Sequence, residues 1–121
     1  MKPTTLDLPD MVAGDHWRAL VGGITITVND LPPANPLSSV RIRFAPTDVP
    51  INQAASETRV ELSSDEASQI VITDAANWEF NCPVQPLALT AGNWRYNIET
   101  TDTTGVVSTF IEGVQIVLPD V

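Results

Sequence analysis

Apolar and polar residues alternate along much of the chain with a period of two. In the stretch VRIRF, Val40, Ile42 and Phe44 share one face, and Arg41 and Arg43 share the other. The same alternation occurs in ITITV (24–28), VEL (60–62), WEFNC (78–82) and WRYNIE (94–99). Because successive side chains of a β-strand point to opposite faces, the pattern predicts strands with one buried and one exposed face.

Proline, glycine and asparagine gather between these segments. The connections read NDLPPANP (29–36), PVQP (83–86), TAGN (90–93) and TDTTG (101–105), and the 10 prolines cluster in such stretches. Proline cannot donate to the hydrogen-bond ladder of a central strand, so this distribution supports the strand assignments. Short strands with frequent turns predict an all-β fold: an immunoglobulin-like antiparallel β-sandwich of about seven to eight strands, with a small barrel as the alternative.

The first thirteen residues differ from the rest of the chain. MKPTTLDLPDMVA contains two prolines and no alternation, whereas the alternating segments all lie within residues 14–121. We therefore expect an N-terminal arm over 1–13 and a single sandwich domain over 14–121. An arm of this kind is expected to order on a neighbouring molecule, with Leu6, Leu8 and Met11 as its contact residues.

Composition and charge limit the classes of partner. The 121 residues are 43% hydrophobic, enough for a core without disulfides or metal, and the formal net charge is −9. An acidic surface repels phosphate backbones and anionic lipids, so neither nucleic acid nor a membrane is expected as a partner. The N-terminus has no apolar run like that of a signal peptide, which favours synthesis and folding in a cytoplasm.

Few residues could carry out a reaction or bind a cofactor. The chain has one histidine, His16, and one cysteine, Cys82, which excludes an intramolecular disulfide and zinc sites built from several such ligands. Cys82 is in phase with Trp78 and Phe80, which predicts a buried and inert thiol. We therefore expect no catalytic residue, no cofactor and no metal.

Arg41 and Arg43 are the clearest charged pair on one strand face. Arginines in this position are expected to pair with carboxylates, either within the chain or on a partner, and they are candidate interface residues. Trp78 and Trp94 fall on apolar strand faces and are predicted core residues, while Trp17 fits either the core or an edge.

The segments AGDHWRALVGGITI, SSVRIRFAP and LTAGNWRYNIETTDTTGVVSTFIEGVQIV together resemble the N-terminal immunoglobulin-like domain of bacteriophage tail and baseplate upper proteins. The closing part is the most similar. It has Ala91-Gly92 before a strand, Trp94 and Tyr96 on the inward phase, Gly105 at a hairpin tip and Gly113 before the final strand.

The resemblance implies a non-enzymatic structural protein of the virion, in the tail or baseplate, that acts as an adaptor between subunits or to a fibre. Its implied partners are other virion proteins in an oligomeric assembly. Two alternatives stay open: a carbohydrate-binding module that uses exposed tryptophans, and a capsid decoration protein. Exposure of Trp17, Trp78 and Trp94 separates the carbohydrate alternative from the others.

Overall fold

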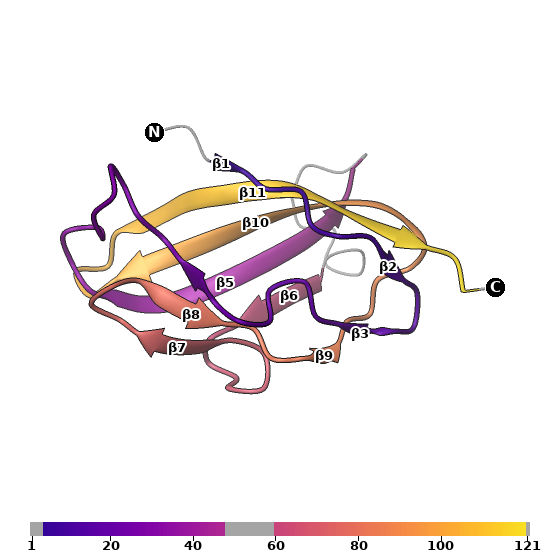
Figure 1. The fold of residues 1–121 in the computed structure, drawn as a ribbon, viewed down its shortest axis with the longest axis horizontal. Coiled ribbons are helices and arrows are strands. Elements are labelled where there is room, and N and C mark those ends of the chain that lie inside the picture. Colours follow the sequence, from indigo (N-terminus) through magenta and orange to yellow (C-terminus); the bar gives the residue numbers. More distant parts are fainter. Residues whose placement is uncertain (1–3, 48–59, 121) are drawn as a thin grey trace.

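The computed structural model describes residues 4–47 and 60–120, and these form an all-β structure without a helix. Three long strands dominate it: β5 (Leu37–Pro46), β10 (Gly92–Asp102) and β11 (Val107–Leu118). They lie side by side along the length of the molecule (Figure 1). The predicted alternation is confirmed here, because Val40, Ile42 and Phe44 of β5 are at most 1% exposed.

The first sheet is built around these strands. Its order is β1-β11-β10-β5-β6, where β1 is Thr4–Thr5 and β6 is Val60–Ser63, and β2 (Met11–Val12) also pairs with β11. β10 is antiparallel to both β5 and β11, with Tyr96 opposite Phe44 on one side and Gly113 on the other. The charged side chains of β5 and β10 therefore share the outer face.

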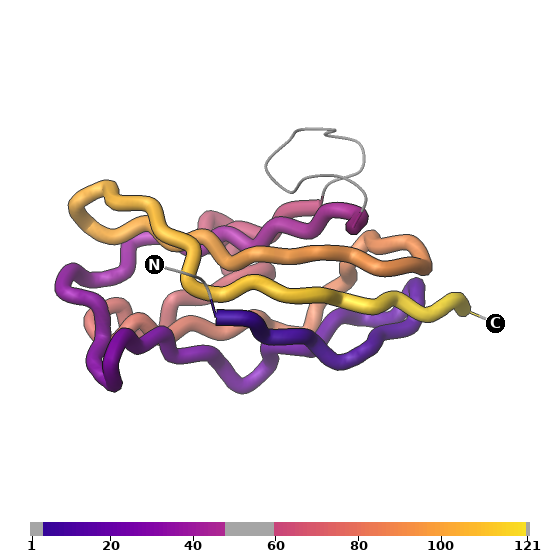
Figure 2. Tube along the Cα trace, turned by 90° about the horizontal axis from the view of Figure 1, so that it is seen from above, coloured from indigo at the N-terminus to yellow at the C-terminus, as the bar shows by residue number. Residues whose placement is uncertain are grey.

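The second layer is smaller. It contains the sheet β4-β8-β7, formed by Ile24–Thr25, Glu79–Asn81 and Val71–Asp74, and the pair β3-β9, formed by His16–Trp17 and Gln85–Pro86. These strands lie across the inner face of the long strands (Figures 1 and 2). Two open sheets facing each other are consistent with a β-sandwich.

The core lies between the two layers and joins them. Trp17 contacts Phe44 edge-on at 5.7 Å between ring centroids, and Trp78 contacts Phe110 in the same way at 5.7 Å. Phe80 and Cys82 of the second layer are at most 1% exposed, as their phase predicted. These aromatic contacts connect residues that are distant in sequence, so the layers stabilise each other.

The N-terminal segment departs from the sequence prediction of a separate arm. β1 and β2 both run parallel to β11, and between them Leu6 N donates to Glu112 O at 2.8 Å and Leu8 N to Val114 O at 3.0 Å. The described part of the predicted arm, residues 4–13, is therefore the edge of the first sheet. Residues 6–10 between β1 and β2 belong to no strand, and Pro9 has no N–H to donate to the ladder.

Gly113 also departs from its predicted place before the final strand. It lies within β11, since Val107–Leu118 form one continuous strand. A Cβ atom at Gly113 would be 2.0 Å from the carbonyl oxygen of Leu6 and 3.0 Å from Cε1 of Tyr96. The missing side chain lets the N-terminal backbone approach β11, where the Tyr96 hydroxyl donates a hydrogen bond to Leu6 O.

Candidate functional site

The two predicted interface arginines lie in a four-residue charge network on the outer face of the first sheet. Arg43 faces Glu61 of β6 in register, and Arg41 faces Glu99 of β10. Arg43 Nη2 is 3.1 Å from each carboxylate oxygen of Glu99, and Arg41 Nε is 3.2 Å from Glu61 Oε1. Two longer contacts of 3.9 Å complete the network. The expected pairing with carboxylates is confirmed, and it occurs within the chain.

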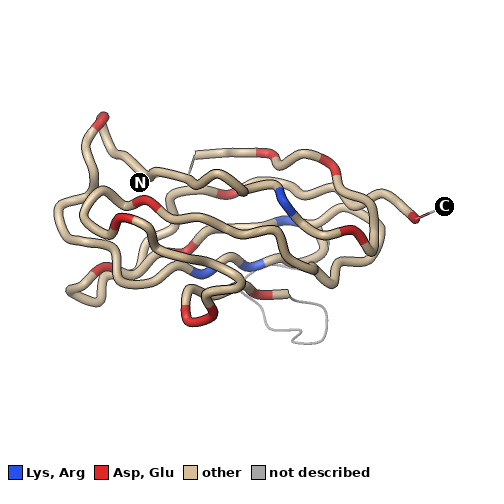
Figure 3. The backbone as a smooth tube through the Cα atoms, turned by 60° about the horizontal axis from the view of Figure 1, so that its bottom comes forward, with Lys and Arg blue, Asp and Glu red and all other residues tan. Residues whose placement is uncertain are grey.

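The two glutamates neutralise the positive charge of Arg41 and Arg43 that would otherwise be available to a partner. The side chains of Arg43 and Glu99 are 16% and 20% exposed, whereas Arg41 is 48% exposed. Arg43 is therefore mainly a structural residue, and Arg41 alone offers a substantial exposed surface. Acidic residues are spread over loops and strands of the described chain around the few basic ones (Figure 3), so the outer surface is predominantly negative.

The predicted contact residues of the arm have different environments. Leu8 is 6% and Met11 9% exposed, and both belong to the core. Their selection as interface residues assumed a free arm, and pairing of this segment with β11 instead turns them inward. Leu6, at 40% exposure, is the one of the three with a large exposed surface.

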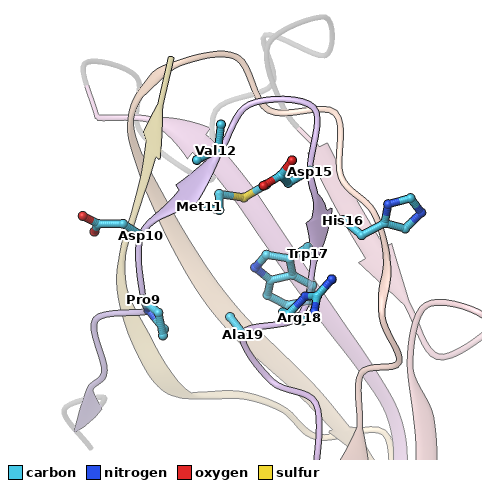
Figure 4. Close-up of a pocket in the computed structure, with 9 residues that line it drawn as sticks. All are labelled: Pro9, Asp10, Met11, Val12, Asp15, His16, Trp17, Arg18 and Ala19. Carbon is cyan, nitrogen blue, oxygen red and sulfur yellow. The ribbon is translucent and has the colours of Figure 1, made fainter. Parts of the chain in front are cut away.

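A pocket of about 280 Å³ lies beside β2 and β3. It is lined by Pro9, Asp10, Met11, Val12, Asp15, His16, Trp17, Arg18 and Ala19, and in Figure 4 Asp10 and His16 project in opposite directions, away from each other. Trp17 points inward, where its Nε1 donates to Gln115 Oε1 at 3.0 Å. The titratable side chains around this pocket do not converge on a common point.

The other group with predicted chemistry is Cys82. Burial raises the pKa of its thiol to about 12, so the nucleophilic thiolate is not formed in the folded protein near neutral pH.

No three His, Cys, Asp or Glu side chains within 4–47 and 60–120 are grouped to hold a metal ion. The Asp102 carboxylate accepts hydrogen bonds from its own hairpin, at 2.8 Å from Thr104 N and 3.1 Å from Val106 N.

The tryptophans decide against a sugar-binding platform. Trp17, Trp78 and Trp94 are 1%, 2% and 7% exposed. Each indole N–H is also bonded inside the protein: Trp17 to Gln115, Trp78 to Asn35 O and Trp94 to Thr90 O. Stacking on a sugar ring needs an exposed aromatic face, so the alternative that depended on these residues is wrong.

A groove of about 410 Å³ between the two layers was not predicted from the sequence. The second layer contributes residues 25–29 at β4, and the first contributes Thr4, Phe110 and Ile111. The relevant sequence signal was ITITV, an uncharged β-branched segment whose burial was predicted but whose sheet position was not. The groove follows a strand edge and holds no cluster of charged groups.

No helix in the described ranges is long and apolar enough to cross a membrane.

Comparison with known proteins adds no relative. No protein-family model, no curated protein and no solved structure matches the chain.

Proposed function

We propose that the chain is a non-enzymatic structural protein of a phage particle, in which an immunoglobulin-like sandwich connects neighbouring subunits of the tail or baseplate. The observation that carries this proposal is the strand order. Labelling β4, β5, β6, β7, β8, β10 and β11 as B, C, C′, D, E, F and G gives the sheets B-E-D and G-F-C-C′. This assignment supports the proposal, because immunoglobulin-like sandwiches pair strands B, E and D in one sheet and G, F, C and C′ in the other.

The closing hairpin supports the same family resemblance. Gly92 begins β10, Trp94 and Tyr96 of that strand point into the core, and Gly105 occupies the turn into β11 with a φ of 88°. These positions support the likeness to phage tail and baseplate domains, whereas Gly113 lies inside β11 and not before it.

The distribution of chemistry favours an adaptor over an enzyme. Arg43 and Glu99, which are largely buried, neutralise each other across β5 and β10. Cys82 is enclosed in the core, and His16 lies on an exposed strand end. A rigid sandwich with open strand edges and charged loops suits docking to other proteins.

Peptide mass spectrometry on gradient-purified virus particles from the source lysate tests this function. Copy number is measured against the main tail and capsid proteins. Roughly a few to a few tens of copies per particle, as the symmetry of a tail or baseplate requires, would support the proposal. Hundreds of copies would indicate a capsid decoration protein instead, and absence from the particles would reject the virion function.

A further inference from the structure

Among residues 4–47 and 60–120, the strand β4 has a hydrogen-bonding partner on one side only. It pairs with β8, through Ile24 opposite Phe80, and Ile26 N donates to Trp78 O at 3.0 Å. Because alternate residues of a strand direct their backbone groups to opposite sides, Thr25 and Thr27 direct theirs away from β8. Neither forms a backbone hydrogen bond with another described residue on that side.

Among the described residues, the other edges of the two larger sheets carry features that discourage pairing. β7 contains a bulge between Ile72 and Asp74, β6 carries Glu61, and the N-terminal edge is interrupted at Pro9 between two short strands. Bulges, charges and prolines are the usual protections of strand edges. Residues 22–28, GGITITV, contain none of these and are rich in β-branched residues.

The turn after β4 keeps the edge accessible. Val28 and Leu31 exchange backbone hydrogen bonds of 2.7 and 3.2 Å around Asn29 and Asp30, whose φ angles of 54° and 65° fit a tight hairpin turn. Val28 lies two residues after Ile26, so the backbone groups of both residues point toward β8. Leu31, which is bonded to Val28, therefore lies on the β8 side. The groove next to Thr25 and Thr27 is left uncovered by it.

The groove also provides apolar contacts for an added strand. Phe110 and Ile111 of the first layer line it and are partly buried against the core. A strand paired with β4 would direct alternate side chains toward these residues and the remainder toward solvent. The site therefore combines a backbone template with an apolar wall, as peptide-binding sheet edges do.

We propose that this edge binds an extended segment of a partner protein, with β-branched apolar residues at alternate positions and lysine or arginine between them. The inference rests on the proposed adaptor function and specifies its docking site. The charge pattern selects the partner: Asp30 follows β4, Glu79 faces Thr25, and the chain carries a net charge of −9. A second copy would bring the same negative charge, whereas a basic segment is attracted.

The test uses the full-length protein and a synthetic ten-residue peptide of alternating valine and lysine. We expect the peptide to slow hydrogen exchange of the Thr25 and Thr27 amides about tenfold or more, without slowing the amides of the β7 edge. A peptide N-methylated on alternate backbone nitrogens lacks the ladder donors and should bind at least about tenfold more weakly. A valine–glutamate peptide should lose affinity to a similar extent.

Thr27→Pro removes one edge donor from the protein, and Thr27→Val is the matched control that retains it. Peptide binding should fall about tenfold or more in the proline variant and stay within about twofold in the control, once circular dichroism confirms that both fold. If Thr27→Pro does not fold, the N-methylated peptide makes the same test on the unchanged protein.

Three results would overturn the assignment. They are equal binding of the methylated and unmethylated peptides, no protection of Thr25 and Thr27 at millimolar peptide, and protection that rises with protein concentration alone, which would identify a second copy as the occupant. None of these affects the copy-number measurement on particles. Failure at the edge is therefore distinguishable from failure of the virion function.

Discussion

Substitution of Gly113 by alanine tests whether the N-terminal segment is part of the folded sheet. The added Cβ would be 2.0 Å from Leu6 O and 2.6 Å from the Leu6 carbonyl carbon. Both are backbone atoms, so a side-chain rotation cannot relieve the overlap. We expect the segment around Leu6 to leave β11 in Gly113→Ala, while the long strands stay paired.

The magnitude follows from what this displacement exposes. Leu8 is 6% exposed, and burial of a leucine side chain contributes about 1.5–3 kcal/mol. The Tyr96 hydroxyl also loses Leu6 O as its acceptor, which costs about 1–3 kcal/mol if no water replaces it. Chain entropy regained by the released residues offsets part of the sum. We expect a net loss of about 2–4 kcal/mol in the free energy of unfolding.

Urea unfolding followed by tryptophan fluorescence measures this loss, and hydrogen exchange locates it at the amides of Leu6 and Leu8. Gly105→Ala is the matched control because no atom lies within 4 Å of its added Cβ. Its positive φ of 88° should cost about 1 kcal/mol without changing exchange at Leu6 or Leu8. A Gly113→Ala stability within about 0.5 kcal/mol of the parent, with both amides still protected, would refute the reasoning.

Three further predictions concern the core and the charge network. Gln115→Leu leaves the buried Trp17 N–H and Pro9 O without their partner, so the free energy of unfolding should fall by about 2–4 kcal/mol in urea titrations. Arg43→Met should cost about 1–2 kcal/mol, and a double-mutant cycle with Glu99→Gln should give a coupling of at least about 0.5 kcal/mol; additive effects would contradict the network. Burial raises the pKa of Cys82 from 9.0 to about 12, so the unfolded chain loses this proton first. The stabilisation that comes from keeping the Cys82 thiol protonated is complete below pH 9 and is lost as the pH rises from 9 toward 12, at up to about 1.4 kcal/mol per pH unit. The free energy of unfolding of Cys82→Ala should lack this decrease at alkaline pH.

The inward faces of the regular strands could be predicted from local pattern. Trp94, Tyr96 and Ile98 alternate strictly with polar residues, and all three are at most 7% exposed. Alternation works here because one face of the sheet is covered and the other is wet, so each position has only two environments. The pairing of Arg41 and Arg43 with carboxylates was predictable for the same reason, although its partners were not.

The phase of β11 was not predictable from hydrophobicity. In GVQIVLP the structure buries Gln115 at 0% exposure and leaves Ile116 at 37% and Leu118 at 42%. Gln115 lies opposite Trp94 in the register, and its side-chain amide bonds Trp17 and Pro9. A buried glutamine is stable only when such partners exist, and they come from segments about one hundred residues away, which no local pattern reveals.

Gly113 and Gln115 determine which sheet edge the N-terminal segment occupies. Gly113 gives the segment room to approach β11, and Gln115 Nε2 donates to Pro9 O at 2.8 Å, which fixes it there. A first strand placed next to β4 would instead have extended the sheet β4-β8-β7. Because residues 4–12 lie along β11, the edge of β4 has no described strand beside it. The contacts that close one side of the sandwich therefore leave the other side available for the segment of a partner.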